Sequence, residues 1–268
     1  MPKLSQLLPE VLSIARLAGA RIMEIYVQDF EVDYKGDDSP LTSADLASHK
    51  VITEKLQALT PDIPCLSEEG ASIPFAERRQ WQTYWLIDPL DGTREFVKKN
   101  GEFTVNIALI TNGEPILGVV SAPALDTDYY AARGIGAFRS EKQQEAERIS
   151  VSACHQPPRL LVSRSHRSAE IDDLLQRIGP HEAVSRGSSL KFCMVACGNA
   201  DLYPRLGLTS EWDTAAGQAV VEAAGGSVSL ADAAQRFAPL RYNTKDSLLN
   251  PHFLVIGDQS HDWTTYFS

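Results

Sequence analysis

The sequence predicts a mixed α/β protein with two layered halves, and three observations support this fold class. Two segments near the N-terminus carry apolar residues at helical spacing. The middle of the chain carries alternating apolar residues around an Asn-Gly turn, which is typical of an antiparallel hairpin. The part that follows alternates short strands with helices. The 268 residues, 43% of them hydrophobic, are enough to bury one large core or two closely packed ones.

The first two elements are helices. Apolar residues recur at three- and four-residue intervals over 8–25, which predicts a long amphipathic helix. A second helix is predicted between a capping hydroxyl, Thr42 or Ser43, and the helix-breaking Thr-Pro pair at 60–61. Asp45 then lies in the first turn of the second helix.

Strands follow in the middle of the chain, and strands and helices alternate after them. Residues 103–111 and 116–121 are predicted to pair as a hairpin across Asn112-Gly113. The second half carries a predicted strand at 160–162, helices at 169–178 and 190–197, a short segment at 201–203 and a helix at 213–224. Two prolines, at 157 and 158, divide the chain into an N-terminal α+β half, 1–157, and a C-terminal α/β half, 158–268.

The charge and cysteine content narrow the class of protein. The net charge is −10 and the pI is near 5.1, so the chain lacks the basic surface of a protein that binds nucleic acid or acidic lipid electrostatically. A small anionic ligand would need metal ions and local cations. The four cysteines have neither the spacing of a zinc site nor the density of a disulfide scaffold, so we expect no zinc and a reducing, cytoplasmic location.

No segment predicts insertion into a membrane. Charged residues interrupt the apolar N-terminus, so no signal peptide is expected, and no uncharged stretch approaches the roughly 18 residues that span a bilayer. Peripheral association with the cytoplasmic face of the inner membrane stays open at this stage, as does the choice between a monomer and a homodimer.

The most informative segment is 85–95, where an apolar run leads into Asp-Pro-Leu-Asp-Gly-Thr. A turn at the end of a strand can direct Asp88, the Leu90 carbonyl and Asp91 at one cation. Gly92 then lets backbone amides approach an anion. This layout predicts a metal and phosphate site.

Further acids are expected beside this segment. Glu68 and Glu69 follow a short apolar segment, just as Asp88 follows the apolar segment before it. Asp213 is the first residue of a predicted helix. Each acid alone is more simply a solvated charge or a helix cap. The set favours a cation site, because clustered carboxylates repel one another unless they are protonated or neutralised. Hard oxygen ligands suit Mg²⁺, and two such ions would activate an attacking water and stabilise the leaving oxygen.

The predicted chemistry is direct attack by water. Thr93 can orient that water, with Asp45 as its partner. Asp-Gly-Thr also ends the Asp-x-Asp-Gly-Thr signature of haloacid dehalogenase-type phosphatases, which form a covalent aspartyl phosphate. Pro89 stands two residues before Asp91 here, so the nucleophile of that mechanism is absent.

Three segments together resemble the signatures of the inositol monophosphatase superfamily: Ser67-Glu68-Glu69, Asp88-Pro-Leu-Asp-Gly-Thr93 and Trp212-Asp213-Thr-Ala-Ala-Gly217. Three more are similar to the bacterial 3'(2'),5'-bisphosphate nucleotidases of that superfamily: Asp-Gly-Thr-Arg-Glu-Phe96 with Asn100-Gly-Glu-Phe-Thr-Val-Asn-Ile107, Ser163-Arg-Ser-His166, and Gly187-Ser-Ser-Leu-Lys-Phe-Cys193. The similarity runs over nearly the whole chain.

The resemblance implies a layered αβαβα sandwich and Mg²⁺-dependent, lithium-sensitive removal of the 3'-phosphate from adenosine 3',5'-bisphosphate (PAP). The products are AMP and phosphate, and the sulfated nucleotide PAPS is a further substrate in such families, which places the activity in sulfur metabolism and nucleotide recycling. The implied ligands of two or three ions are Glu68, Asp88, the Leu90 carbonyl, Asp91 and Asp213. Asp45 and Thr93 would activate water with help from Glu68, while 90–93 and Asp213 would contact the substrate. For Glu69 two roles stay open, support of the metal ligands or contact with a third ion.

Nucleotide recognition is implied in the second half. His166, Ser188, Lys191 and Arg205 match positions that hold the adenosine and its 5'-phosphate. The net charge of −10 supports this assignment. A protein this acidic that binds a bisphosphate needs basic side chains at whichever phosphate the metal ions do not neutralise. Without the resemblance, these residues would be a solvated lysine, a loop arginine and surface polar groups.

Three alternatives stay open. Inositol monophosphatase and fructose-1,6-bisphosphatase activities share the metal signatures, so only the second half discriminates among them. A catalytically silent protein that binds nucleotide and metal is the alternative of a different class. The water-activating pair, Asp45 and Thr93, favours an enzyme.

Overall fold

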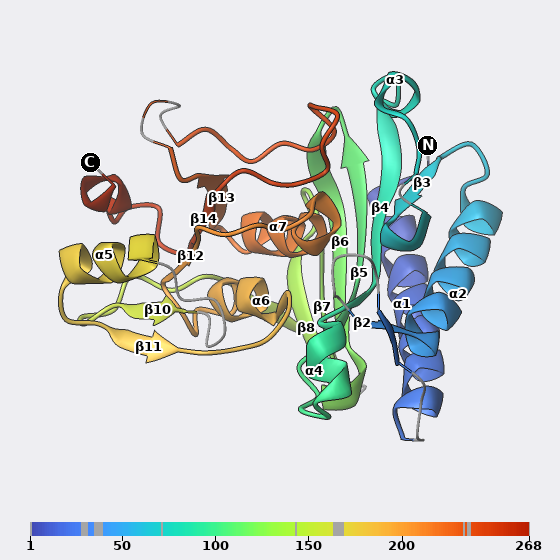
Figure 1. Cartoon of the computed structure of the whole chain (residues 1–268), viewed down its shortest axis with the longest axis horizontal. Helices are drawn as coiled ribbons and strands as arrows, with labels where there is room; N and C mark the ends of the chain where they lie inside the picture. The colour runs from blue at the N-terminus through green and yellow to red at the C-terminus, as the bar shows by residue number, and fades with distance from the viewer. Residues whose placement is uncertain are drawn as a thin grey trace.

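The structure, a computed structural model, consists of two β-sheets separated and flanked by helices (Figure 1). It describes residues 2–27, 32–34, 40–70, 72–142, 144–162, 169–232, 234 and 237–267. The larger sheet has seven strands, in the order β3 (Cys65–Ser67), β4 (Thr83–Asp91), β5 (Thr104–Thr111), β6 (Glu114–Ala122), β7 (Thr127–Ala132), β8 (Gly136–Glu141) and β9 (Glu147–Ile149). The smaller sheet has five, in the order β11 (Glu182–Val184), β10 (Arg159–Leu161), β12 (Leu202–Arg205), β14 (Phe253–Ile256) and β13 (Ser227–Leu230). A separate ribbon pairs β1 (Val32–Tyr34) with β2 (Pro40–Thr42).

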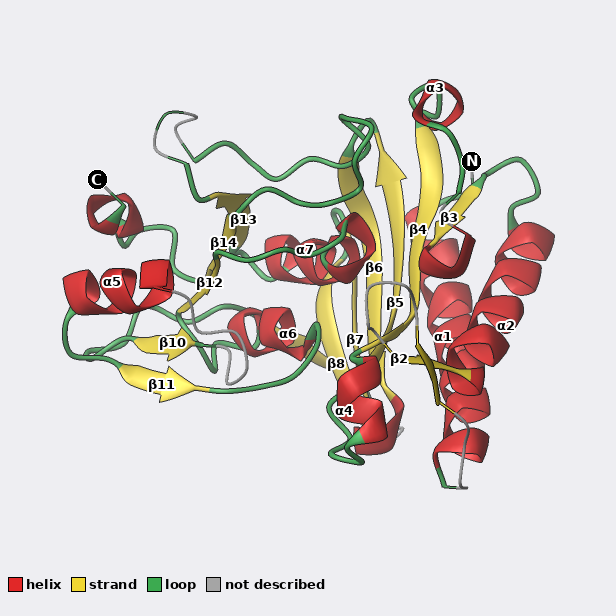
Figure 2. Ribbon diagram, viewed as in Figure 1, coloured by secondary structure: helices red, strands yellow, loops and turns green. Residues whose placement is uncertain are grey.

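The helices complete five layers (Figure 2). The outer face of the large sheet carries α1 (Leu4–Tyr26) and α2 (Ser43–Leu59). Between the sheets lie α6 (Leu190–Ala196) and α7 (Ala215–Ala223), and α5 (Ala169–Ile178) covers the far side of the small sheet with the 3₁₀ turn η4 (Trp263–Tyr266). Short elements are η1 (Glu68–Gly70), α3 (Phe75–Arg78), α4 (Thr93–Val97), η2 (Pro123–Leu125) and η3 (Glu211–Asp213). This order of layers confirms the αβαβα sandwich that the sequence resemblance implies.

Close packing between α7 and the large sheet joins the two halves. Gly118 lies in β6, and a Cβ atom there would collide with the backbone of Ala216 in α7. Because both faces of β5 and β6 are covered by helices, seven of the eight residues of β5 are buried. A helix from the second half of the chain therefore packs directly on the sheet of the first half, and the division into 1–157 and 158–268 stays a prediction.

Most of the predicted elements are confirmed. The second helix begins at Ser43, the hairpin pairs β5 with β6, and α5 spans the predicted residues. The strands β7, β8 and β9, which extend the large sheet beyond this hairpin, were not predicted.

The segment expected to be a turn at the end of a strand is instead a bulge inside β4. Asp88 pairs with Asn106 and Asp91 pairs with Thr104, so three steps in β4 face two steps in β5. In a regular strand, residues three apart point to opposite faces. The bulge removes this alternation, and the backbone N–H of Leu90 turns to the Asp88 Oδ1 atom at 3.1 Å.

A second expectation needs correction. Asp213 does not open the long helix, because it ends the 3₁₀ turn η3 and α7 begins at Ala215. Its carboxylate accepts a hydrogen bond from the backbone N–H of Ser210 at 2.8 Å, which closes the turn on itself.

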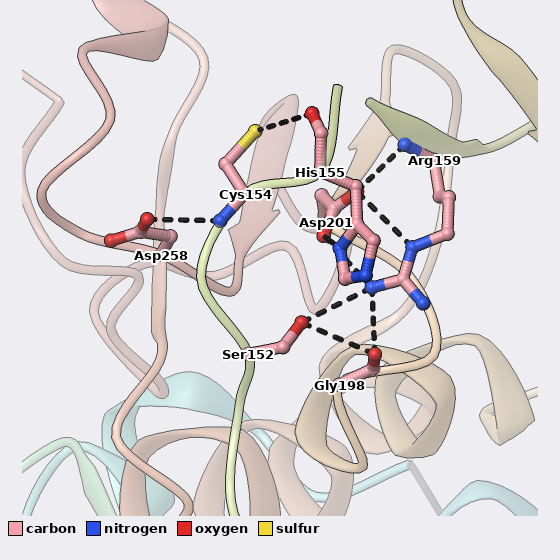
Figure 3. A network of polar contacts seen from close by, with 7 residues as sticks. All are labelled: Ser152, Cys154, His155, Arg159, Gly198, Asp201 and Asp258. Atoms are coloured by element: carbon pink, nitrogen blue, oxygen red, sulfur yellow. Dashed lines mark hydrogen bonds and ion pairs between the residues drawn. The ribbon is translucent and has the colours of Figure 1, made fainter. Parts of the chain in front are cut away.

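The connection between the sheets, 150–158, is held by a buried carboxylate (Figure 3). Asp201 is 1% exposed and accepts hydrogen bonds from the backbone and the guanidinium of Arg159, at 2.7 and 3.0 Å. The His155 Nδ1 atom lies 3.2 Å from the same carboxylate. Arg159 also donates to the Gly198 carbonyl at 2.6 Å, and the backbone of Cys154 donates to Asp258. These contacts fix the start of the small sheet.

None of the helices in the described part of the chain combines the length and the apolar character that crossing a bilayer requires.

Candidate metal and phosphate site

Three carboxylates converge where the large sheet meets the helices of the middle layer. Asp88 and Asp91 come from the bulge in β4, and Asp213 comes from η3. One carboxylate oxygen from each lies within 4.8 Å of the others. Oxygens at this spacing can contact one hard cation together.

Two further acids act on this group. The parallel pairing of Ser67 with Ile87 places Glu68 after β3 at the edge where Asp88 lies in β4, as the sequence predicted. Asp45 lies in the first turn of α2 and is fully buried. The 4.8 Å group found among the described residues contains neither Glu68 nor Asp45, but the charges of both act on Asp88.

The electrostatics favour a bound cation. Burial raises the pKa of Asp88 well above its ordinary value, and the charges of the neighbouring acids raise it further. Burial also raises the pKa of Asp213 to about 8, with a further increase from Asp91, while the hydrogen bond from Ser210 acts in the opposite direction. A divalent cation would remove this repulsion, so the residues present fit a hard divalent metal ion.

The second half of the chain holds Asp91 directly. The Asp91 Oδ2 atom accepts hydrogen bonds from the Ser188 hydroxyl, from the Ser189 backbone N–H at 2.7 Å and from the Ser189 hydroxyl at 2.7 Å. Ser188 has φ of 51°, in the left-handed region. Sequence reasoning missed Ser189, because no motif or spacing distinguishes it from its neighbour.

Gly92 and Thr93 follow the bulge. Gly92 has φ of 90°, and a Cβ atom there would lie 3.3 Å from the Ser188 Cβ atom, so this close turn favours glycine. Thr93 is the first residue of α4. The pairing of Thr93 with Asp45 stays a prediction.

A cavity of about 480 Å³ opens beside the acids and includes Asp91 and Asp213 in its lining. Its remaining wall is rich in cations: Arg94, Lys98, Arg186, Lys191 and Arg205. The carboxylates and the cations therefore face one space, which suits an anion that bridges a metal ion and basic side chains.

The structure brings three of the four predicted nucleotide contacts to this cavity. Ser188, Lys191 and Arg205 all line it. The Lys191 ammonium donates to the Ser188 carbonyl at 2.8 Å and lies 5.5 Å from the centre of the Tyr203 ring. Burial lowers the pKa of Lys191, and the charge of Asp91 opposes that shift. His166 lies outside the described residues.

Residues 3–259 match the sequence profile described as the inositol monophosphatase family. The chain belongs to this family. Enzymes of the family depend on metal ions, in agreement with the acidic cluster.

Two curated relatives of this family member are bisphosphate nucleotidases by name. The chain is 50% identical over 252 residues to the 3'(2'),5'-bisphosphate nucleotidase CysQ of Salmonella typhimurium, covering 93% of this chain and 99% of that protein. It is 40% identical over 264 residues to the protein of the same name from Haemophilus influenzae, covering 97% and 96%.

Solved structures support the same family assignment. The crystal structure of CysQ from Bacteroides thetaiotaomicron superposes with a TM-score of 0.80 at 42% identity, covering 92% of this chain and 96% of that one. An inositol monophosphatase from Anabaena gives a TM-score of 0.77 at 28% identity, covering 98% and 95%. These matches confirm the predicted family resemblance and the fold.

Proposed function

We propose that the protein is a 3'(2'),5'-bisphosphate nucleotidase that removes the 3'-phosphate of PAP and releases AMP and phosphate. The observation that carries the proposal is one cavity with two anion-binding walls, an acidic cluster that fits metal and a set of basic side chains. A bisphosphate offers one phosphate to each wall. Relatives at 40–50% identity carry this activity in their names.

The metal ions would be Mg²⁺, two or three in number. Their ligands would be the three clustered acids together with Glu68 and the Leu90 carbonyl. When bound, Mg²⁺ supplies a water of lowered pKa and stabilises the charge of the leaving oxygen.

Side chains and backbone groups of the protein would position the attacking water and the phosphate. Thr93 would orient the attacking water, and Asp45 would accept its proton, with Glu68 nearby to support the same step. The glycine turn at Gly92 would admit a phosphate oxygen close to the backbone.

The basic wall would select the nucleotide. Lys191 and Arg205 would neutralise the 5'-phosphate, and Ser188 and His166 would hold the adenosine side. PAPS would bind in the same way, because its sulfate is attached to the 5'-phosphate and leaves the 3'-phosphate unchanged. We place the enzyme in the cytoplasm, as a monomer or homodimer, with or without peripheral contact with the inner membrane.

The test compares PAP, PAPS, inositol 1-phosphate and fructose 1,6-bisphosphate at equal Mg²⁺, with and without lithium, by phosphate release. The proposal expects the highest kcat/KM for PAP or PAPS. Preference for a sugar phosphate would contradict it, and tight PAP binding without phosphate release would identify a silent nucleotide-binding protein. Lithium inhibition alone would support only the family.

A further inference from the structure

Ser189 lies at the junction of the two segments that supply the clustered acids. It is 2% exposed and directly precedes α6. Its hydroxyl lies 2.7 Å from the Asp91 Oδ2 atom and 2.7 Å from the Asp213 backbone carbonyl. The Asn106 side-chain amide donates to the same hydroxyl at 2.9 Å. One side chain thus contacts both the bulge of β4 and the turn η3.

The hydroxyl has one proton for two acceptors. Because Asn106 donates into the Ser189 oxygen, that proton goes either to Asp91 or to the carbonyl of Asp213. In either state the oxygen stays fixed between the two segments. Asp91 is the neighbour whose charge most raises the pKa of Asp213, so Ser189 holds together two acids that repel each other.

The same contacts determine which oxygen of Asp91 is available. A carboxylate oxygen has about two lone pairs for hydrogen bonding. The Ser188 hydroxyl and the Ser189 backbone N–H already donate to the Oδ2 atom, and the Ser189 hydroxyl lies 2.7 Å from it. The Oδ1 atom is therefore the one left to face a cation, and the orientation of the carboxylate is set before an ion arrives.

We propose that Ser189 is a positioning residue for the metal centre, which holds Asp91 and Asp213 at cation-binding spacing and leaves Asp91 as a one-oxygen ligand. The inference rests on the acidic cluster being the metal site of the proposed function, but it does not require PAP to be the substrate. Groups that orient metal ligands in this way typically change metal affinity by about 10- to 100-fold when they are removed.

The experiment titrates substrate-free protein with Mn²⁺ and follows the EPR signal of free Mn²⁺ at about pH 7.5. Ser189→Ala should weaken the tightest Mn²⁺ binding about tenfold. Ser189→Thr, which keeps the hydroxyl, should bind within about threefold of the parent. The matched control is Ser152→Ala, which removes a partly buried serine hydroxyl in the inter-sheet connection and should bind Mn²⁺ like the parent.

A second readout separates positioning from general damage. With its preferred substrate, Ser189→Ala should need about tenfold more Mg²⁺ for half-maximal rate yet approach the parental kcat at saturating Mg²⁺. A kcat that stays low at every Mg²⁺ concentration, or an unchanged Mn²⁺ affinity, would overturn the inference. If Ser189→Ala does not fold, Asn106→Leu, which removes the donor that fixes the hydroxyl, should weaken Mn²⁺ binding, and unchanged affinity there would overturn it equally. If Ser189→Ala weakens Mn²⁺ binding but the parent protein does not hydrolyse PAP, the substrate assignment is refuted and the role of Ser189 still holds.

Discussion

Replacing Asp213 with asparagine should stabilise the metal-free protein at neutral pH, although it removes a proposed metal ligand. Burial and the charge of Asp91 raise the pKa of Asp213 from 3.8 to about 8. The folded protein therefore holds a proton that the unfolded chain has released. Its contribution to stability is complete below about pH 4, and the free energy of unfolding falls as the pH rises from about 4 to about 8.

The magnitude follows from the shift. Each pKa unit corresponds to about 1.4 kcal/mol, and about three units separate pH 7 from the ordinary pKa, which gives about 4 kcal/mol. This value is an upper bound because the clustered acids share their protons. The introduced asparagine keeps a carbonyl oxygen to accept the hydrogen bond from Ser210, so the variant should gain on the order of 1–3 kcal/mol at about pH 7.5.

The assay is urea unfolding in EDTA at several pH values from about 5 to about 8, with Asp62→Asn as a control that removes an exposed charge. The stability difference between Asp213→Asn and the parent should grow with pH, and the control should show no such trend. Added Mg²⁺ should reverse the order and stabilise the parent more. A variant that is less stable than the parent in EDTA near neutral pH, or a difference that does not vary with pH, would refute the electrostatic reasoning.

Four other substitutions test separate parts of the structure. Asp91→Asn should abolish phosphate release, whereas Lys191→Ala should raise KM for PAP about tenfold or more with a smaller change in kcat, because it removes the charge-assisted contact that we propose between Lys191 and the substrate. Equal losses of kcat in both would contradict the division of roles. Asp201→Ala should lower the free energy of unfolding by about 3 kcal/mol, since it leaves the partly buried Arg159 guanidinium without its carboxylate, and urea unfolding measures this loss. Gly187→Ala should raise KM and weaken Mn²⁺ binding, because the added Cβ atom would lie 2.9 Å from the Glu102 carbonyl and displace the serines that hold Asp91. Values equal to those of the parent would show that this segment can shift without disturbing Asp91.

The parts of the fold that the sequence predicts well have local signals. The sequence before and within the helix that begins at Ser43 offers hydroxyl residues that can cap a helix and an apolar face, and the β5–β6 hairpin has its Asn-Gly turn. The neighbouring positions of Glu68 and Asp88 were also predictable, since both follow short apolar runs that pair in parallel. The bulge in β4 has no such signal, because it exists only relative to the register of β5. The strands β7–β9, which form one end of the sheet, are mixed in polarity, so their pattern did not indicate strands.

Residues that position the acids were harder to predict for a related reason. Ser189 is 98 residues from Asp91 and 24 from Asp213, and its role depends on three contacts that meet only in the folded chain. A serine before a helix has the same local sequence whether it caps that helix or orients a carboxylate. Motifs in the sequence thus indicate which acids are the candidate metal ligands, whereas long-range packing determines their geometry.

The opposite side of the site depends on long-range contacts as well. Glu211 begins the turn that ends at Asp213, and both of its carboxylate oxygens accept from the Asn243 backbone N–H, at 3.0 and 2.9 Å. Arg78, which is 2% exposed and belongs to α3 in the first half, donates to the Asn243 side chain at 2.6 Å. Asp213 is therefore tied to the first half through Arg78 and Asn243, and to Asp91 through Ser189. Since both ties cross from one half of the chain to the other, the acidic cluster can reach its cation-binding spacing only when the two halves are packed together.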